Sequence, residues 1–202
     1  MKIYDSQAAP NPRRVRVFLA EKGIQVPMEP VDIVAAVNRG AEFRKKNVTA
    51  GVPVLELDDG TYIAESVAIC RYFEEIQPQP PLFGANAKER AVVEMWQRRI
   101  ELNLLIPVAD AFRQRHDFFK GRIRQVPAYA EVQKQNAEDA LKWIDEDLAG
   151  RRFIAGDHYT IADITAMIAI DFGRVSKIAI APDQKNLARW HAEVSARPSA
   201  KA

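Results

Sequence analysis

The chain has 202 residues, of which 48% are hydrophobic and 28% are charged. These values are typical of a globular protein and exclude a mostly disordered chain, and the length allows one domain or two small ones. The 29 lysines and arginines are balanced by 27 aspartates and glutamates. This balance gives no indication of nucleic acid or an anionic membrane as a partner.

Strand and helix signals alternate in the first quarter of the chain. Asn11 is placed to cap a helix N-terminus, Pro12 would be the first helical residue, and Gly23 would end the helix. Hydrophobic periodicity and turn residues predict a strand at 1–4, this helix at 13–22, a strand at 25–30 and a loosely helical region at 32–46.

Residues 51–72, GVPVLELDDGTYIAESVAICRY, hold several signals in a fixed order. Val52-Pro53 opens an apolar run, and Glu65-Ser66 precedes a helical pattern in which Ser66 is expected to be the N-cap. Between these two dipeptides the pattern is that of a β-hairpin. The stretch predicts a strand at 54–57, a turn at 58–61, a strand at 62–64 and a helix from Ser66 to about Glu74.

A proline-rich segment separates the two halves of the chain. Gln77-Pro78-Gln79-Pro80-Pro81 cannot form a helix, so the first domain is expected to end near Gln77 and a stiff linker to follow. Beyond the linker Thr160 and Asp163 have the spacing of a capping box, with Asp in place of the usual Glu or Gln. Apolar periodicity predicts helices at 87–119, with a kink or break at Pro107, at 127–147 and at 187–195.

The order Val-Pro, hairpin, Glu-Ser, helix closely resembles the glutathione-binding half of the glutathione transferase family. The Thr160–Asp163 pattern resembles the start of the central helix in the helical domain of that family, so the resemblance covers almost the full length. It implies an α/β plus all-α fold. The expected domains are a thioredoxin-like βαβαββα domain at 1–77, a Pro-rich linker at 78–85 and an all-helical domain at 86–202.

The resemblance also implies which residues contact glutathione. The Val52-Pro53 bond would be cis, and its backbone would pair with the cysteinyl part of glutathione. Glu65 would pair with the γ-glutamyl ammonium, and Ser66 would take the γ-glutamyl carboxylate at the helix N-terminus. Asn38 and Arg39 lie where the family often places a donor for the glycyl carboxylate, although Lys45 and Lys46 compete for that role.

The group that stabilises the glutathione thiolate departs from the family pattern. The family usually places Tyr, Ser, Cys or Thr near the end of the first loop, but this chain has Ala8, Ala9 and Pro10 there. Members resembling the nu class carry Thr-Pro-Asn, so here the amide of Asn11 remains and the hydroxyl is missing. Asn11 is therefore the first candidate for the thiolate donor, with Ser6 and then Tyr4 behind it. The alternative is that Asn11 only caps the helix and that catalysis is weak or lost.

The second substrate is expected to lie against the first long helix of the helical domain. For the aromatic residues in this set, core packing is at least as good an interpretation as substrate contact, and a solvated surface residue is the favoured interpretation of His116. No metal-ligand spacing is present, and no metal is expected. The candidates for this pocket are Trp96, Arg99, Asn103, Phe112, His116 and Phe172.

The resulting hypothesis is a cytoplasmic, homodimeric glutathione transferase that conjugates glutathione to small, mostly apolar electrophiles. A glutathione-dependent disulfide or peroxide reductase and a non-catalytic interaction module of the same fold are alternatives. The single cysteine, Cys70, excludes an internal disulfide, fits a reducing compartment and is interpreted as structural. Two basic clusters, at 13–16 and 113–124, are interpreted as solvated helix faces.

Overall fold

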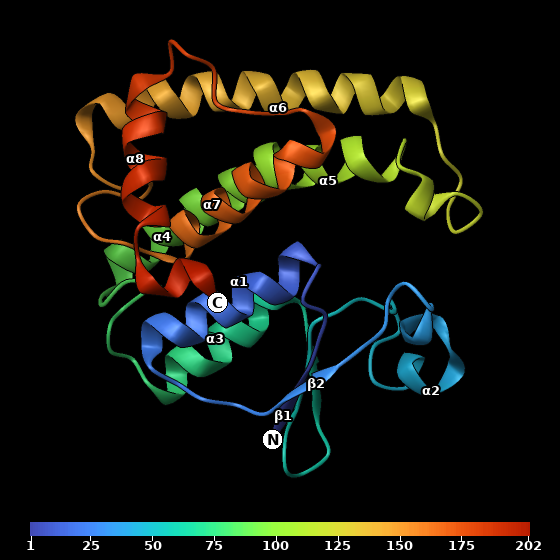
Figure 1. Cartoon of the computed structure of the whole chain (residues 1–202). Coiled ribbons are helices and arrows are strands. Elements are labelled where there is room, and N and C mark those ends of the chain that lie inside the picture. Colours follow the sequence, from blue (N-terminus) through green and yellow to red (C-terminus); the bar gives the residue numbers. More distant parts are fainter. The chain divides into compact units, whose positions relative to one another are not determined.

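The computed structural model describes residues 1–202 and divides the chain into two compact units (Figure 1). The first unit comprises Met1–Pro81 with Lys201–Ala202, and the second comprises Leu82–Ala200. No helix in either unit combines the length and the apolarity that crossing a membrane requires.

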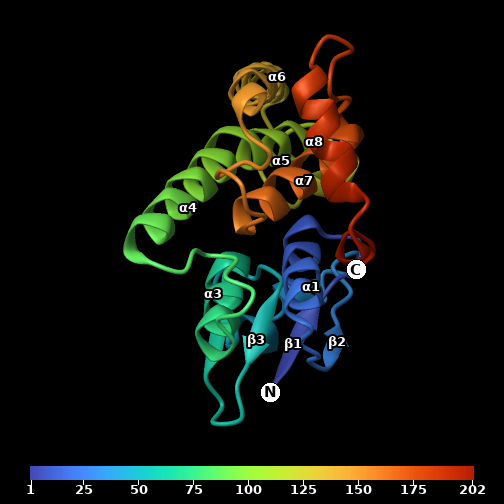
Figure 2. The same ribbon diagram turned by 90° about the vertical axis from the view of Figure 1, so that its left-hand side faces the viewer.

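The first unit is a four-stranded mixed sheet with helices. The sheet order is β2-β1-β3-β4, with β1 parallel to β2 and antiparallel to β3, and with β3 antiparallel to β4. In Figures 1 and 2, α1 and α3 lie side by side, as their contacts require. The elements are β1 Lys2–Asp5, α1 Pro10–Lys22, β2 Met28–Pro30, η1 Val37–Arg39, α2 Ala41–Arg44, β3 Val54–Glu56, β4 Tyr62–Ala64 and α3 Ser66–Ile76.

Alternation along the strands gives the sheet two apolar faces. Ile3 on β1 lies opposite Leu55 on β3, and both are almost completely buried. Their neighbours Tyr4 and Val54 point to the other face, where they pack with Phe43 of α2. The βαβαββα order expected from the resemblance is therefore the observed one, and it is the thioredoxin-like arrangement.

The starts of α1 and α3 differ from the sequence prediction. Ala9 is the N-cap of α1 and Pro10 its first residue, so Asn11 lies inside the helix and does not cap it. Proline is tolerated in the first helical turn because no intrahelical N–H bond is needed there. Glu65, not Ser66, is the N-cap of α3, and it adopts a left-handed φ of 66°. The predicted end of α1 at Gly23, with φ of 65°, is confirmed.

The second unit consists of helices packed around a buried central helix, α7. Ten consecutive residues, from Ile161 to Ile170, are buried, and α4, α5 and α8 contact α7. The capping box of Thr160 and Asp163 is present at its start, as predicted. The elements are α4 Ala87–Ile100, η2 Glu101–Leu105, α5 Ile106–Arg113, η3 Asp117–Phe119, α6 Pro127–Asp147, η4 Leu148–Gly150, α7 Ile161–Gly173, η5 Arg174–Ser176, α8 Lys185–Ser195 and η6 Pro198–Lys201.

Pro107 interrupts the first long helix of this unit by a π-helical turn. The turn, η2, separates α4 from α5, and the Ile106 N–H donates to the carbonyl of Glu101, five residues earlier. Because Pro107 has no N–H, the carbonyl of Asn103 cannot receive the usual bond from four residues ahead. The predicted interruption at Pro107 is confirmed, but α5 ends at Arg113 and not near residue 119.

Candidate functional site

The loop between β1 and α1 is held by a buried ion pair. Arg16 Nη1 lies 2.5 Å from Asp5 Oδ1, and Asp5 is 3% exposed. Arg16 Nη2 also donates to the Gln7 carbonyl at 3.3 Å, and the Ala9 N–H closes a turn onto the Ser6 carbonyl at 3.1 Å. Separating this ion pair would leave a buried charge without its partner, which costs free energy. The pair therefore holds the loop in one conformation.

Asn11 carries the only backbone N–H among the first three residues of α1. Its neighbours Pro10 and Pro12 have none, and the Arg13 N–H already donates to the Ala9 carbonyl at 3.3 Å. Neither the N–H nor the half-buried carboxamide of Asn11 makes a hydrogen bond within the chain. Because the N-terminus of a helix carries partial positive charge, an anion placed here would meet two available donors of one residue.

The other two candidates for a thiolate donor are placed differently. The Tyr4 hydroxyl donates to Glu56 Oε2 at 2.6 Å, so its proton is already committed to a neighbouring strand. Ser6 is 7% exposed and its hydroxyl makes no hydrogen bond within the chain. Ser6 therefore retains a donor for a ligand, whereas Tyr4 does not.

The segment before β3 presents a backbone edge. The Val52-Pro53 peptide bond is cis, and the Val52 backbone makes no hydrogen bond within the chain. Asn47 Nδ2 donates to the Gly51 carbonyl at 2.9 Å and thereby holds the residue before Val52. An extended peptide could add to this edge as an extra strand because the N–H and carbonyl of Val52 are available.

Asn38, on η1, forms a hydrogen bond to the segment that leads to Val52. Its Nδ2 donates to the carbonyl of Ala50 at 2.7 Å, and its Oδ1 is buried without a partner. Ala50 has a φ of 57°, which is uncommon for a residue other than glycine, so the bond from Asn38 helps to hold an unusual backbone conformation. The neighbouring Arg39 is exposed.

The N-terminus of α3, like that of α1, presents backbone N–H groups that an anion could accept from. The N–H groups of Ser66, Val67 and Ala68 make no hydrogen bond within the chain, as expected for a helix N-terminus. Ser66 Oγ accepts a hydrogen bond from Arg14 Nη1 at 3.1 Å. Glu65 is exposed beside them and holds its left-handed conformation at the helix start, where strained residues often mark functional sites.

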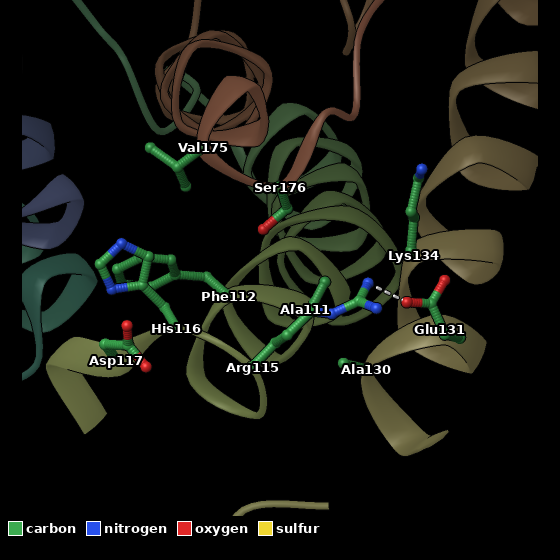
Figure 3. Close-up of a pocket in the computed structure, with 10 residues that line it drawn as sticks. All are labelled: Ala111, Phe112, Arg115, His116, Asp117, Ala130, Glu131, Lys134, Val175 and Ser176. Carbon is green, nitrogen blue, oxygen red and sulfur yellow. Dashed lines mark hydrogen bonds and ion pairs between the residues drawn. The ribbon is translucent and has the colours of Figure 1, made fainter. Parts of the chain in front are cut away.

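The second unit contains a cavity of about 290 Å³ near the end of α5. In Figure 3 the ring of His116 lies against Phe112, and the two ring centroids are 4.5 Å apart. His116 Nδ1 accepts from the Phe118 N–H at 3.1 Å, so in the neutral ring the proton sits on Nε2. The cavity is lined by Ala111, Phe112, Arg115, His116, Asp117, Ala130, Glu131, Lys134, Val175 and Ser176.

The remaining candidates for the second-substrate pocket do not line this cavity. Phe172 packs edge-on against the lining residue Phe112, with ring centroids 5.2 Å apart. Trp96 is 6% exposed and has the guanidinium of Arg99 4.8 Å from its ring. Asn103 Nδ2 donates to the Arg99 carbonyl at 2.9 Å. The structure therefore brings Phe112, His116 and Phe172 together, and it places the other three residues along α4 and η2.

Sequence comparison identifies both halves of the chain. Residues 8–76 match the N-terminal domain of glutathione S-transferases, and residues 99–198 match the C-terminal domain. Glutathione S-transferase 2 of Saccharomyces cerevisiae is 35% identical over 208 residues, which cover 100% of this chain and 88% of that protein. The chain belongs to the glutathione S-transferase family.

Solved structures of the glutathione S-transferase family share the fold over its whole length. A glutathione S-transferase domain-containing protein of Marinobacter aquaeolei VT8 superposes with a TM-score of 0.94 at 41% identity, covering 98% of this chain and 99% of that one. Gtt2 of Saccharomyces cerevisiae superposes with a TM-score of 0.95 at 34% identity, covering 100% and 99%.

Sequence reasoning missed two arginines of this glutathione S-transferase. The cluster at 13–16 was expected to be a solvated helix face, but Arg14 is 1% exposed and the Arg16 side chain is 10% exposed. That expectation was wrong for both residues, because each guanidinium reaches a buried partner on another element. The available signal was their position in the first turns of α1, next to the candidate donor Asn11.

Cys70 lies on α3 and is completely buried. Burial raises the pKa of the Cys70 thiol far above its ordinary value, which disfavours the nucleophilic thiolate. No group of three or more His, Cys, Asp or Glu side chains is arranged to hold a metal ion. The interpretation of Cys70 as structural agrees with its burial.

Proposed function

We propose that this protein is a glutathione transferase that binds glutathione as its thiolate and conjugates it to small, apolar electrophiles. The observation that carries the proposal is the set of available groups in the first unit. Asn11, the Val52 backbone and the start of α3 all offer hydrogen-bonding groups that the chain itself does not use. A module that served only as a scaffold would have no need of these groups.

Each part of glutathione has a complementary group in this unit. The cysteinyl backbone would pair with Val52 beside Pro53, and the γ-glutamyl carboxylate would bind Ser66. Glu65 would pair with the γ-glutamyl ammonium, since it is exposed next to that helix start. For the glycyl carboxylate, Asn38 and Arg39 are the expected donors; Asn38 Nδ2 donates one hydrogen to the Ala50 carbonyl and keeps a second N–H.

The thiolate would be stabilised by Asn11 at the N-terminus of α1. A free thiol has a pKa of about 8.5, and each unit by which binding lowers that pKa corresponds to about 1.36 kcal/mol. The Asn11 N–H and carboxamide would donate to the sulfur, and the partial positive charge of the helix would add to their effect. Ser6 is the next candidate, since its hydroxyl is also available.

The electrophile would occupy the cavity of the second unit. Phe112, which packs against Phe172, supplies an aromatic wall, and His116 offers an Nε2 donor. Six of the ten lining residues are polar or charged, among them the Arg115–Glu131 ion pair, so the apolar part of the electrophile would lie against Phe112. Family membership further supports a homodimer, which we propose as the assembly of this protein.

Reduction of disulfides or peroxides by glutathione is the second candidate activity. The observation that favours it is the absence of a hydroxyl at Ala8, Ala9 and Pro10, with Asn11 in its place. Titrating the protein with glutathione while following thiolate absorbance against pH tests the shared first step. Parallel assays with 1-chloro-2,4-dinitrobenzene and with 2-hydroxyethyl disulfide then separate conjugation from reduction.

The variant Asn11→Ala decides the role of the proposed donor. We expect the pKa of the bound thiol to lie well below 8.5 in the wild type and to rise by about one unit in the variant, as expected for loss of one hydrogen bond to a charged group. An equal pKa in both proteins would assign the thiolate to the helix terminus or to Ser6. Failure of glutathione to bind at all would exclude both enzyme activities and favour an interaction module.

A further inference from the structure

Arg14 of α1 has a buried guanidinium that contacts the first residue of α3. It is 1% exposed, and its Nη1 lies 3.1 Å from Ser66 Oγ. Burial raises the pKa of the Cys70 thiol; the charge of Arg14 acts to lower that pKa, and the charge of Glu74 acts to raise it. A charge held in such apolar surroundings is screened far less than a surface charge, so it contributes to the local potential at Ser66.

The bond from Arg14 determines what the Ser66 hydroxyl can do. A serine hydroxyl has one donor and two acceptor positions, and here Arg14 occupies an acceptor position. Nothing in the chain accepts the Ser66 proton, although Ser66 is only 5% exposed. The hydroxyl is thus left to donate to a group that the chain does not provide. The adjacent N–H groups of Val67 and Ala68 are available in the same way.

We propose that Arg14 is a positioning residue for the γ-glutamyl carboxylate of glutathione and acts through Ser66. Arg14 holds and polarises the hydroxyl so that its proton points to the carboxylate, and its charge favours an anion at this helix start. This inference rests on the proposed function, because it assigns a role within the same glutathione site. In this role Arg14 acts on glutathione only through the Ser66 hydroxyl and is not a catalytic residue.

A pair of ligands that differ only in that carboxylate separates this role from a structural one. Glutathione is compared with 4-aminobutanoyl-cysteinyl-glycine, which keeps the amine, the thiol and the glycyl carboxylate but lacks the γ-glutamyl carboxylate. Dissociation constants are measured by calorimetry for the wild type, Arg14→Met, Arg14→Lys and Ser66→Ala. Arg71→Met is the charge-matched control, since Arg71 is an arginine of the same helix, five residues after Ser66.

We expect the wild type to prefer glutathione over the analogue, and Arg14→Met and Ser66→Ala each to reduce that preference by roughly tenfold. Arg14→Lys should retain more of the preference than Arg14→Met because it keeps the charge. Combining Arg14→Met with Ser66→Ala should add little, since both act through one hydroxyl. Arg71→Met should leave the preference unchanged.

An Arg14→Met protein that binds both ligands more weakly by the same factor would overturn the inference, because Arg14 would then only support the fold. Thermal unfolding of each variant accompanies the binding data and identifies such a loss of fold. A wild-type protein that binds neither ligand would exclude the proposed function itself. That result is distinguishable from failure of the inference, in which the wild type still binds glutathione.

Discussion

Asp163 is a completely buried carboxylate that four donors surround. Its Oδ1 accepts from the Ile154 N–H at 2.8 Å and from Trp190 Nε1 at 2.9 Å. Its Oδ2 accepts from the Thr160 N–H at 2.9 Å and from the Thr160 hydroxyl at 3.0 Å. Burial disfavours the charged form more than these bonds favour it, and the pKa of Asp163 rises from its ordinary 3.8 to about 6.

This raised pKa predicts a pH dependence of stability. Between about pH 4 and pH 6 the folded protein holds a proton that the unfolded chain has lost, so the contribution of Asp163 to the free energy of unfolding falls as pH rises. Over this window the fall should be about 3 kcal/mol. The measurement is urea unfolding of the wild type and Asp163→Asn at pH 4, 5, 6 and 7. The difference between the two proteins should shrink toward pH 7; a difference that grows with pH would show that the four hydrogen bonds outweigh burial.

Single residues of the candidate site were predictable from sequence only where local rules apply. Glu65 and Ser66 follow a hairpin and start a helix, so their place at a helix N-terminus could be predicted to within one residue. The hydrogen bond that occupies the Tyr4 hydroxyl could not be predicted, because its acceptor Glu56 is distant in sequence. Arg14 was missed for the same reason: its partner Ser66 lies on another helix.

At the scale of elements, Lys22 joins the C-terminal ends of α1 and α3. Its side chain is completely buried and donates to the carbonyls of Gln77 at 2.8 Å and Pro80 at 2.5 Å. It also forms an ion pair with Glu74, whose side chain is 8% exposed. In return, Gln77 Nε2 donates to the Lys22 carbonyl at 2.5 Å. The segment that follows α3 is thereby attached to the end of α1.

Removing this lysine should destabilise the protein strongly. We expect Lys22→Met to lower the free energy of unfolding by about 3–5 kcal/mol, because it takes one partner from a buried ion pair. Adding Glu74→Leu should restore a large part of the loss, since it removes the carboxylate that Lys22 pairs with in the wild type. Chemical denaturation of the single and double variants measures both effects.

Lys45→Met is the matched control for this experiment. Lys45 also pairs with a glutamate in the first unit, but its side chain and that of Glu42 are 69% and 84% exposed. Exposed pairs contribute little, so this variant should change stability by less than about 0.5 kcal/mol. Equal effects of Lys22→Met and Lys45→Met would show that the buried ion pair does not hold the two helices.

At the scale of the whole molecule, the order of elements was predictable because each follows from local chemistry. The hairpin follows from a turn with Gly60 between two apolar runs, and the interruption in the second unit follows from Pro107. Exact helix starts were not predictable, because proline is accepted at several positions of a first turn. Which helical residues form a pocket depends on packing between distant elements, and so Trp96 and Phe112 looked alike in the sequence.

The second unit exposes an apolar stripe along α4, η2 and α5, and we propose this stripe as the interface of the proposed dimer. Met95, Leu102 and Ile106 are 39%, 46% and 39% exposed, and their spacing of seven and four residues places them along one side of a helix. Large apolar side chains grouped on a surface often mark an interface. In a twofold dimer each of these residues would meet the same surface of the partner.

Sedimentation analysis of the wild type should therefore give twice the chain mass of 22.8 kDa. Leu102→Lys should shift the protein to the monomer, weakening association by roughly a hundredfold or more, because two like charges would then be buried near one axis. Val132→Lys is the control, since Val132 is an apolar residue on α6 that is 54% exposed, slightly more than Leu102. A dimer that survives Leu102→Lys but not Val132→Lys would move the interface to α6. A wild type that sediments as a monomer would contradict the proposed assembly and leave the stripe on α4 as solvent-exposed surface.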